Sequence, residues 1–202
     1  MSDSVESRVM GIIIGHGRGW CFTSKNFMEI GSEASVRKAL SSLEKKQRLV
    51  RLTQGVYEYP KIHKRLGVVP PNILSVAKAI AEKNGVQIQP AGALAANIVG
   101  LSEQVPGKVV YLTEGPSKTV KIGNQVIIFK RAAKKVMIPA GTREGTLIEA
   151  LKEIGKDHID ENTSKQIRIF LRSSSEEEVK DRLKFAPTWI RSAVYDALEI
   201  SV

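Results

Sequence analysis

The chain has 202 residues and a formal net charge of +10, with 31 Lys and Arg against 21 Asp and Glu. This length is enough for one or two domains with cores of their own, and a single cysteine excludes an intramolecular disulfide or a cysteine-based zinc cluster. No stretch approaches the ~20 apolar residues of a membrane span. Because the first residues also lack the pattern of a signal peptide, we expect a cytoplasmic protein without a membrane partner.

The first 66 residues predict a compact series of short elements. We expect a helix over 5–14, a strand over 20–23, a helix over 25–30 capped by Thr23 or Ser24, and a helix over 32–46. Two β-prone runs, 49–52 and 56–59, follow and are joined by a turn that contains Gly55, which predicts a tight hairpin. This order of elements is that of a winged helix-turn-helix, so we assign residues 1–66 to such a domain.

The helix over 32–46 is expected to carry the face that reads DNA. Val36, Leu40 and Leu43 recur at i, i+4 and i+7 and form one apolar stripe towards a core. Polar residues on the opposite side would then face a major groove, and the hairpin is suited to phosphates. The candidate DNA-binding residues are Ser35, Arg37, Lys38, Ser41, Ser42, Lys45, Arg51, Thr53 and Gln54.

Positive charge is concentrated in the first two thirds of the chain. Residues 1–66 hold twelve Lys and Arg against six acids, residues 67–140 hold nine against three, and residues 141–202 hold ten against twelve. Such an excess is expected where a protein neutralises phosphates, which favours duplex DNA as the partner. The alternative is a winged helix or small α+β scaffold that docks proteins and does not contact nucleic acid.

A basic linker over 61–67 and the Pro70-Pro71 pair predict a boundary, with a second domain over 67–202. Its expected helices cover 72–83, about 91–99, 144–154, 164–171, 176–185 and 188–198, and its expected strands cover 86–89, 108–113, 119–122 and 125–129. The fold class is therefore α+β: an N-terminal winged helix-turn-helix followed by a mixed α+β domain with a helical C-terminal part. The basic residues Lys130, Arg131, Lys134 and Lys135 form either a second contact with nucleic acid or an acidic partner, or a solvated loop.

Residues suited to catalysis are sparse. No aspartate lies between Asp3 and Asp157, whereas Mg²⁺-dependent phosphoryl or nucleotidyl transfer uses acidic ligands. The three histidines show no metal-ligand spacing, and the glycine-rich 15–19 segment lacks the Gly-Lys-Ser/Thr ending of a phosphate loop. We therefore expect neither an enzyme nor a bound metal or cofactor. The acids between residues 67 and 140 that an enzyme would have to use are Glu82, Glu103 and Glu114.

Several segments resemble AbiEi-type proteins, which are antitoxins and transcriptional regulators of type IV abortive-infection toxin–antitoxin systems. These segments are Ala39-Leu40, Leu43, Leu49–Leu52, Gly55–Tyr57, Pro90–Asn97, Gly100–Ser102, Tyr111–Pro116 and, as in related uncharacterised chains, Phe185–Trp189. The resemblance implies a repressor that binds the promoter of its own operon. It also implies that the protein opposes a nucleotidyltransferase-like toxin encoded nearby, without needing a stable complex with it.

Two other functions remain open at the level of sequence. One is a winged-helix regulator that responds to a small ligand in the second domain and has no toxin partner. The other is an enzyme that acts on nucleotides, which the scarcity of acidic residues disfavours.

Overall fold

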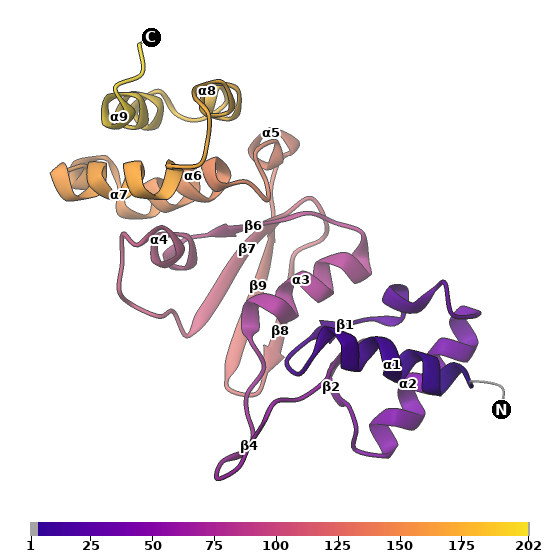
Figure 1. Cartoon of the computed structure of the whole chain (residues 1–202). Helices are drawn as coiled ribbons and strands as arrows, with labels where there is room; N and C mark the ends of the chain where they lie inside the picture. Colours follow the sequence, from indigo (N-terminus) through magenta and orange to yellow (C-terminus); the bar gives the residue numbers. More distant parts are fainter. Residues whose placement is uncertain (1–3, 202) are drawn as a thin grey trace. The chain divides into compact units, whose positions relative to one another are not determined.

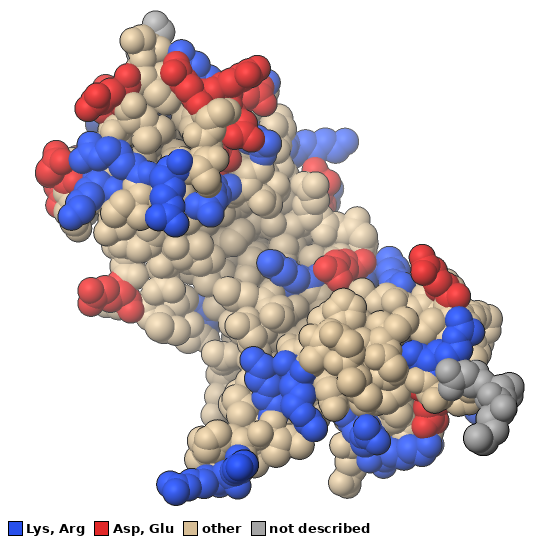
Figure 2. Space-filling model, in the orientation of Figure 1, with Lys and Arg blue, Asp and Glu red and all other residues tan. Residues whose placement is uncertain are grey.

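The computed structural model describes residues 4–201 and shows an α+β protein made of two compact units (Figure 1). The first unit contains the chain up to Gly85 together with Ile122–Asn124, and the second contains Val86–Lys121 and the chain from Gln125 onward. Lys and Arg side chains are visible over both units (Figure 2).

The first unit begins with the order of elements that the sequence predicts. Its elements are α1 (Val5–His16), β1 (Cys21–Phe22), the 3₁₀ helix η1 (Ser24–Phe27), α2 (Glu33–Lys45), β2 (Val50–Thr53), β3 (Val56–Glu58), β4 (Ile62–His63), β5 (Gly67–Val68) and α3 (Ile73–Asn84). Strands β1, β3 and β2 form an antiparallel sheet in that order. The short strand before η1 therefore pairs with the hairpin, through β3.

Side-chain caps determine where these helices start. At the start of η1 the Thr23 hydroxyl accepts the Lys25 backbone N–H, and the Asn26 side chain accepts the Thr23 backbone N–H, as in a capping box. The Ser32 hydroxyl accepts the Ser35 N–H at the start of α2. The helix expected over 25–30 is shorter than predicted, because η1 is a single 3₁₀ turn that ends at Phe27.

The apolar stripe of α2 lies in the core of the first unit, as the periodicity predicts. Val36 and Leu40 are fully buried. On α1 the sequence predicts a buried side of Val5, Val9, Ile12 and Ile13. This prediction is wrong for Ile12, which is 40% exposed, and Met10 is buried in its place. At 100° per residue, Met10 and Ile12 both lie about 80° from the direction midway between Val9 and Ile13, so the helical period alone does not determine which of them is buried. The core residues are Val9, Met10, Ile13, Phe22, Phe27, Ile30, Val36, Ala39, Leu40, Leu43, Leu49 and Tyr57.

Helix α3 belongs to the first unit, whereas the sequence placed it after the boundary. It contacts β1 and β3, and the Lys83 ammonium donates a hydrogen bond of 2.5 Å to the carbonyl of Gln54 in the hairpin turn. The Pro70-Pro71 pair thus redirects the chain without separating two units, and the continuous N-terminal part of the first unit ends at Gly85. This residue closes α3 in the left-handed conformation.

The second unit combines a four-stranded sheet with a layer of helices. Its elements are β6 (Ile88–Ala91), α4 (Ala93–Val99), β7 (Lys108–Thr113), β8 (Lys118–Ile122), β9 (Gln125–Arg131), α5 (Lys134–Met137), α6 (Arg143–Ile154), the 3₁₀ helix η2 (Lys156–His158), α7 (Glu161–Leu171), α8 (Glu176–Leu183) and α9 (Thr188–Leu198). The strand order is β6-β7-β9-β8; β6 is antiparallel and β9 parallel to β7. Helix α7 starts three residues earlier than predicted because Asp160, not a later residue, caps it.

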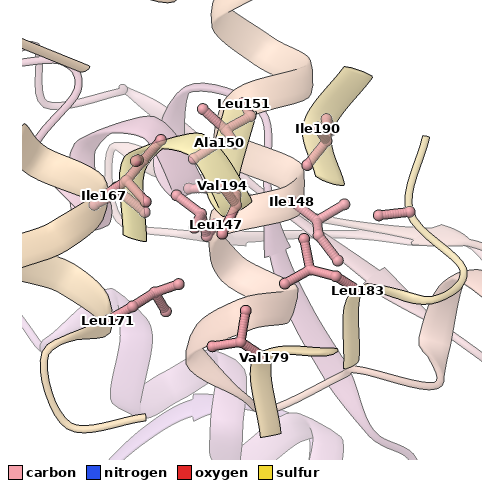
Figure 3. Packing of buried hydrophobic residues seen from close by; sticks show 14 residues of the cluster. Leu147, Ile148, Ala150, Leu151, Ile167, Leu171, Val179, Leu183, Ile190 and Val194 are labelled. Carbon is pink, nitrogen blue, oxygen red and sulfur yellow. The ribbon is translucent and has the colours of Figure 1, made fainter. Parts of the chain in front are cut away.

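The core of the second unit is built around α6 (Figure 3). Leu147, Ala150 and Leu151 of this helix are fully buried. They belong to one cluster with residues of α4, α7, α8 and α9, so the helical C-terminal part is a packed layer rather than a tail. Among the residues that the structure describes, no helix is long and apolar enough to cross a membrane.

Candidate nucleic-acid interface

A basic pocket lies between α2 and the β2–β3 hairpin of the first unit. Arg37 of α2, Arg51 and Gln54 of the hairpin, and Lys83 of α3 line it. Three of the candidate residues, which are up to 17 positions apart in the sequence, thus meet at one place. Sequence reasoning missed Lys83, because only the folded chain brings α3 to the hairpin turn.

Next to this pocket, α2 presents a polar ridge to solvent. Lys38 and Lys45 are exposed and Ser41 is half-buried, on the side of the helix opposite the fully buried Val36 and Leu40. The ridge therefore has the orientation that the periodicity predicts. Helix α2 has 13 residues and is therefore about 20 Å long. An α-helix with its side chains is about 10–12 Å in diameter, which fits the ~12 Å width of the major groove of B-DNA.

Two further candidates on α2, Ser35 and Ser42, lie on the edge that faces α1. The Ser35 hydroxyl donates to the carbonyl of Ser32 at 2.8 Å. Lys46 and Ser42 both hydrogen-bond to the Glu6 carboxylate and hold its pKa below the ordinary value. Both serines are thus already engaged within the first unit, and the exposed ridge does not include them.

The hairpin presents its candidate residues at different depths. Arg51 and Gln54 are exposed, whereas Thr53 is half-buried and pairs with Val56 across the hairpin. Gly55 in the turn has a φ of +70°, a conformation that side chains with a Cβ rarely adopt. The turn is therefore fixed by Gly55 and by the Lys83 hydrogen bond, and it holds the exposed pair in place.

Arg37 is exposed but paired. Its guanidinium contacts the Glu33 carboxylate at 2.5 Å, and the two side chains are 69% and 51% exposed. An exposed i,i+4 pair of this kind contributes only about 0.3–0.5 kcal/mol. A phosphate would replace the carboxylate at little cost, so the pair leaves Arg37 available to an anionic partner.

The glycine-rich 15–19 segment is a turn between α1 and β1. Arg18 donates a hydrogen bond of 2.8 Å to the carbonyl of Pro60, and its guanidinium lies 4.6 Å from the centre of the Tyr59 ring. The indole of Trp20 stacks on His16 at 3.7 Å. Arg18 therefore links the end of the hairpin to the turn, and Trp20 packs against the core of the first unit.

The second basic run is divided between two elements. Lys130 and Arg131 are exposed neighbours on β9, so they point to opposite faces of the strand. Lys134 and Lys135 begin α5. Lys135 lines a pocket of the second unit together with Glu149, Lys152 and Arg182, and Lys152 is paired with Glu149 at 2.6 Å.

Side chains that could serve as metal ligands are dispersed in the folded chain. Within residues 4–201, no three His, Cys, Asp or Glu side chains gather closely enough to hold a metal ion.

Comparison with known proteins gives one clear result. Residues 8–179 match the profile of a family described as "Family of unknown function (DUF6088)". The chain belongs to this family. No curated protein matches it. Among solved structures, the crystal structure of the RV2827C protein from Mycobacterium tuberculosis is similar with a TM-score of 0.43 at 14% identity, covering 90% of this chain and 72% of that chain; a likeness at this level carries no information on function.

In this DUF6088 chain, two titratable groups lie opposite each other in the β1-β3-β2 sheet of the first unit. Cys21 of β1 and Glu58 of β3 are cross-strand partners, 6% and 2% exposed. Burial, with a contribution from the Glu58 charge, raises the pKa of the Cys21 thiol to about 12. Burial also raises the pKa of the Glu58 carboxyl above its ordinary value of 4.5, and Lys61 offsets part of that shift.

The raised pKa of Glu58 predicts how the first unit responds to pH. The folded state favours the protonated carboxyl, so this group stabilises the fold below pH 4.5 and loses that contribution as the pH rises through the folded-state pKa. We therefore expect Glu58→Gln to raise the melting temperature at pH 7. The gain should vanish towards pH 4. Thermal melts across this range test it, with Glu103→Gln on an exposed loop as the control. Equal melting of Glu58→Gln and wild type at every pH would show that ionised Glu58 costs nothing.

Proposed function

We propose that the protein is a DNA-binding transcriptional regulator whose first unit is a winged helix-turn-helix. In this assignment α2 is the recognition helix and the β2–β3 hairpin is the wing. The observation that carries the proposal is the common pocket of Arg37, Arg51 and Gln54 between helix and hairpin, beside the ridge of Lys38, Ser41 and Lys45. One surface thus offers charge for phosphates and short polar side chains for base edges.

The regulatory context comes from the resemblance to AbiEi-type proteins. We propose that the protein represses its own operon and acts, in the cytoplasm, as the antitoxin to a nucleotidyltransferase-like toxin encoded nearby. No catalytic residue is assigned in this proposal. Expression of the neighbouring gene with and without this chain tests the antitoxin role, since growth arrest that this chain fails to relieve would contradict it.

A second candidate is a regulator that answers a small ligand. The second unit has a pocket where the apolar side chains of Ile159 and Trp189 meet the charged Lys156 and Asp196, a mixture typical of ligand sites. A metabolite that raises the melting temperature of the wild type, but not that of Trp189→Ala, would favour this function.

The ridge of α2 should carry sequence preference. We expect Lys38→Ala and Ser41→Ala each to weaken binding to a duplex from upstream of the protein's own gene, by about 1–3 kcal/mol where the side chain makes a bidentate hydrogen bond to a base. Binding to a scrambled duplex of equal length should change far less. Arg51→Ala and Gln54→Ala on the wing should instead weaken both duplexes about equally, because phosphate contacts carry no sequence information.

These affinities are measured by fluorescence anisotropy at fixed salt. Lys165→Ala, on the exposed side of α7 in the second unit, removes a comparable charge and serves as the control. If the Lys38 and Ser41 variants keep the full preference for the upstream duplex, α2 is not the reading helix. If the wild type binds neither duplex, the proposal that the first unit binds DNA is contradicted, and the protein-docking alternative is favoured.

A further inference from the structure

A small hairpin follows the β3 strand where the sequence predicts only a linker. Strands β4 and β5 pair antiparallel, with Ile62 opposite Val68 and His63 opposite Gly67. Every residue from 61 to 68, here called the arm, is exposed. In Figure 1 the arm extends away from the helices α1 and α2 of the first unit.

The arm is ordered at both ends. At its base, the Gly19 N–H donates to the Tyr59 carbonyl at 2.6 Å and the Val69 N–H donates to the Lys61 carbonyl at 2.9 Å. At its tip, Nδ1 of His63 accepts the N–H groups of both Arg65 and Leu66, at 3.2 and 3.3 Å. These bonds fix the turn before any partner binds, so little conformational entropy remains to be lost on binding.

Apolar side chains on the arm face solvent. Leu66 at the tip is 79% exposed, and the cross-strand pair Ile62 and Val68 are 59% and 57% exposed. Three large apolar residues on so short a hairpin bury little within the chain. Exposure of this kind marks a contact surface for a partner.

The charge of the arm identifies the class of partner. Lys61, Lys64 and Arg65 flank the apolar residues, and no Asp or Glu lies between Glu58 and Glu82. Figure 2 shows Lys and Arg side chains at the end of the arm, which Figure 1 labels β4. The partner is therefore a polyanion that also receives an apolar side chain. Duplex DNA provides both, as phosphates along the groove and as the faces of stacked bases.

We propose that the arm enters the minor groove of DNA next to the segment held by α2 and the wing, and that Leu66 inserts between two base pairs and bends the duplex. This inference rests on the proposed function, because it requires the first unit on DNA. The arm begins two residues after β3 of the wing and belongs to the same unit.

The geometry of the groove explains the bend. The minor groove of B-DNA is about 6 Å wide, and two strands are already about 4.8 Å apart before their side chains are added. The arm fits only if the groove opens. Insertion of an apolar side chain unstacks a base step, widens the groove there and bends the duplex away from the wedge.

A fluorescence-transfer experiment on the full-length protein tests the bend. The probe is a 30-base-pair duplex from upstream of its own gene, with a donor and an acceptor dye at its two ends. Saturation with wild type should raise the transfer efficiency. Leu66→Ala should bind the same duplex with little or no rise, since the wedge is removed while the cations remain. Ile138→Ala, which removes a 52% exposed apolar side chain from the second unit, should behave like wild type.

The cations have their own readout. The double variant Lys64→Ala/Arg65→Ala should reduce the slope of log K against log salt by about 1.8, at about 0.9 per phosphate contact. If wild type and both arm variants bind with equal slopes and equal transfer, the arm does not touch DNA, although the proposed function stands. If wild type binds no DNA, both proposals fail.

The alternative partner of the arm is a second copy of the chain. Sedimentation without DNA distinguishes it, since a wild-type dimer that Leu66→Ala converts to a monomer would assign the apolar tip to self-association and overturn the inference. A monomer in both cases, together with a bend that disappears in Leu66→Ala, is the result expected for a minor-groove wedge.

Discussion

Raising the salt concentration from 50 to 200 mM should weaken binding of the protein to duplex DNA by about 500-fold, if ~5 phosphates are neutralised and each contributes about −0.9 to the log–log slope. The first unit supplies the cations at the pocket and on the ridge. They are Arg37, Lys38, Lys45, Arg51 and Lys83. Any phosphate held by the arm would make the dependence steeper.

Anisotropy titrations at four salt concentrations between these limits give the slope directly. The double variant Arg37→Ala/Arg51→Ala should be shallower by about 1.8, since two phosphate partners are removed. Lys165→Ala in the second unit should keep the wild-type slope. Binding that is flat across this range would exclude an electrostatic footprint on the first unit.

Gly145→Ala should destabilise the second unit more than any surface substitution. Gly145 lies in the first turn of α6, where an added Cβ would sit 2.1 Å from the Pro139 carbonyl oxygen and 2.9 Å from Oε1 of Gln89. Backbone at Pro139 cannot move aside easily. Overpacking of this kind costs roughly 1–3 kcal/mol or more.

The same substitution disturbs a buried polar network. Gln89 accepts the Gly141 N–H at 2.9 Å and donates to the Thr146 hydroxyl at 3.0 Å, and it is 1% exposed. Displacing it leaves buried groups unpaired, at about 1–3 kcal/mol in addition. Chemical denaturation should show the decrease in stability. Gly107→Ala, where a Cβ meets nothing within 4 Å, should unfold like wild type; similar curves for the two variants would mean that α6 shifts to accept the methyl.

Local patterns explain why most elements of the first unit were predictable. A hydroxyl at Ser32, the spacing of Val36, Leu40 and Leu43, and a glycine turn each act within a few residues, so they can be read from the chain. The arm has no such pattern. Its strands are two residues long and exposed throughout, so the alternation that marks a half-buried strand is absent.

The candidate interface divides in the same way. The ridge of Lys38, Ser41 and Lys45 could be predicted, because it lies opposite a stripe that is visible in the sequence. The engagement of Ser42 depends on Glu6 of another helix, and the position of Lys83 depends on a hydrogen bond to a residue 29 positions away. Both contacts depend on packing between elements that are far apart in the sequence, so the periodicity of the sequence does not predict them. The end of the first unit was misplaced for the same reason.

The buried thiol of the first unit gives the chain a built-in reporter of local opening. The chain has one cysteine, and a pKa of about 12 keeps Cys21 in the unreactive protonated form while it stays buried beside Glu58. An alkylating reagent would therefore label the chain only when β1 leaves the sheet. The rate of labelling measures how often β1 leaves the sheet, and no engineered probe is needed. If bound DNA keeps the first unit closed, it should slow the labelling of Cys21.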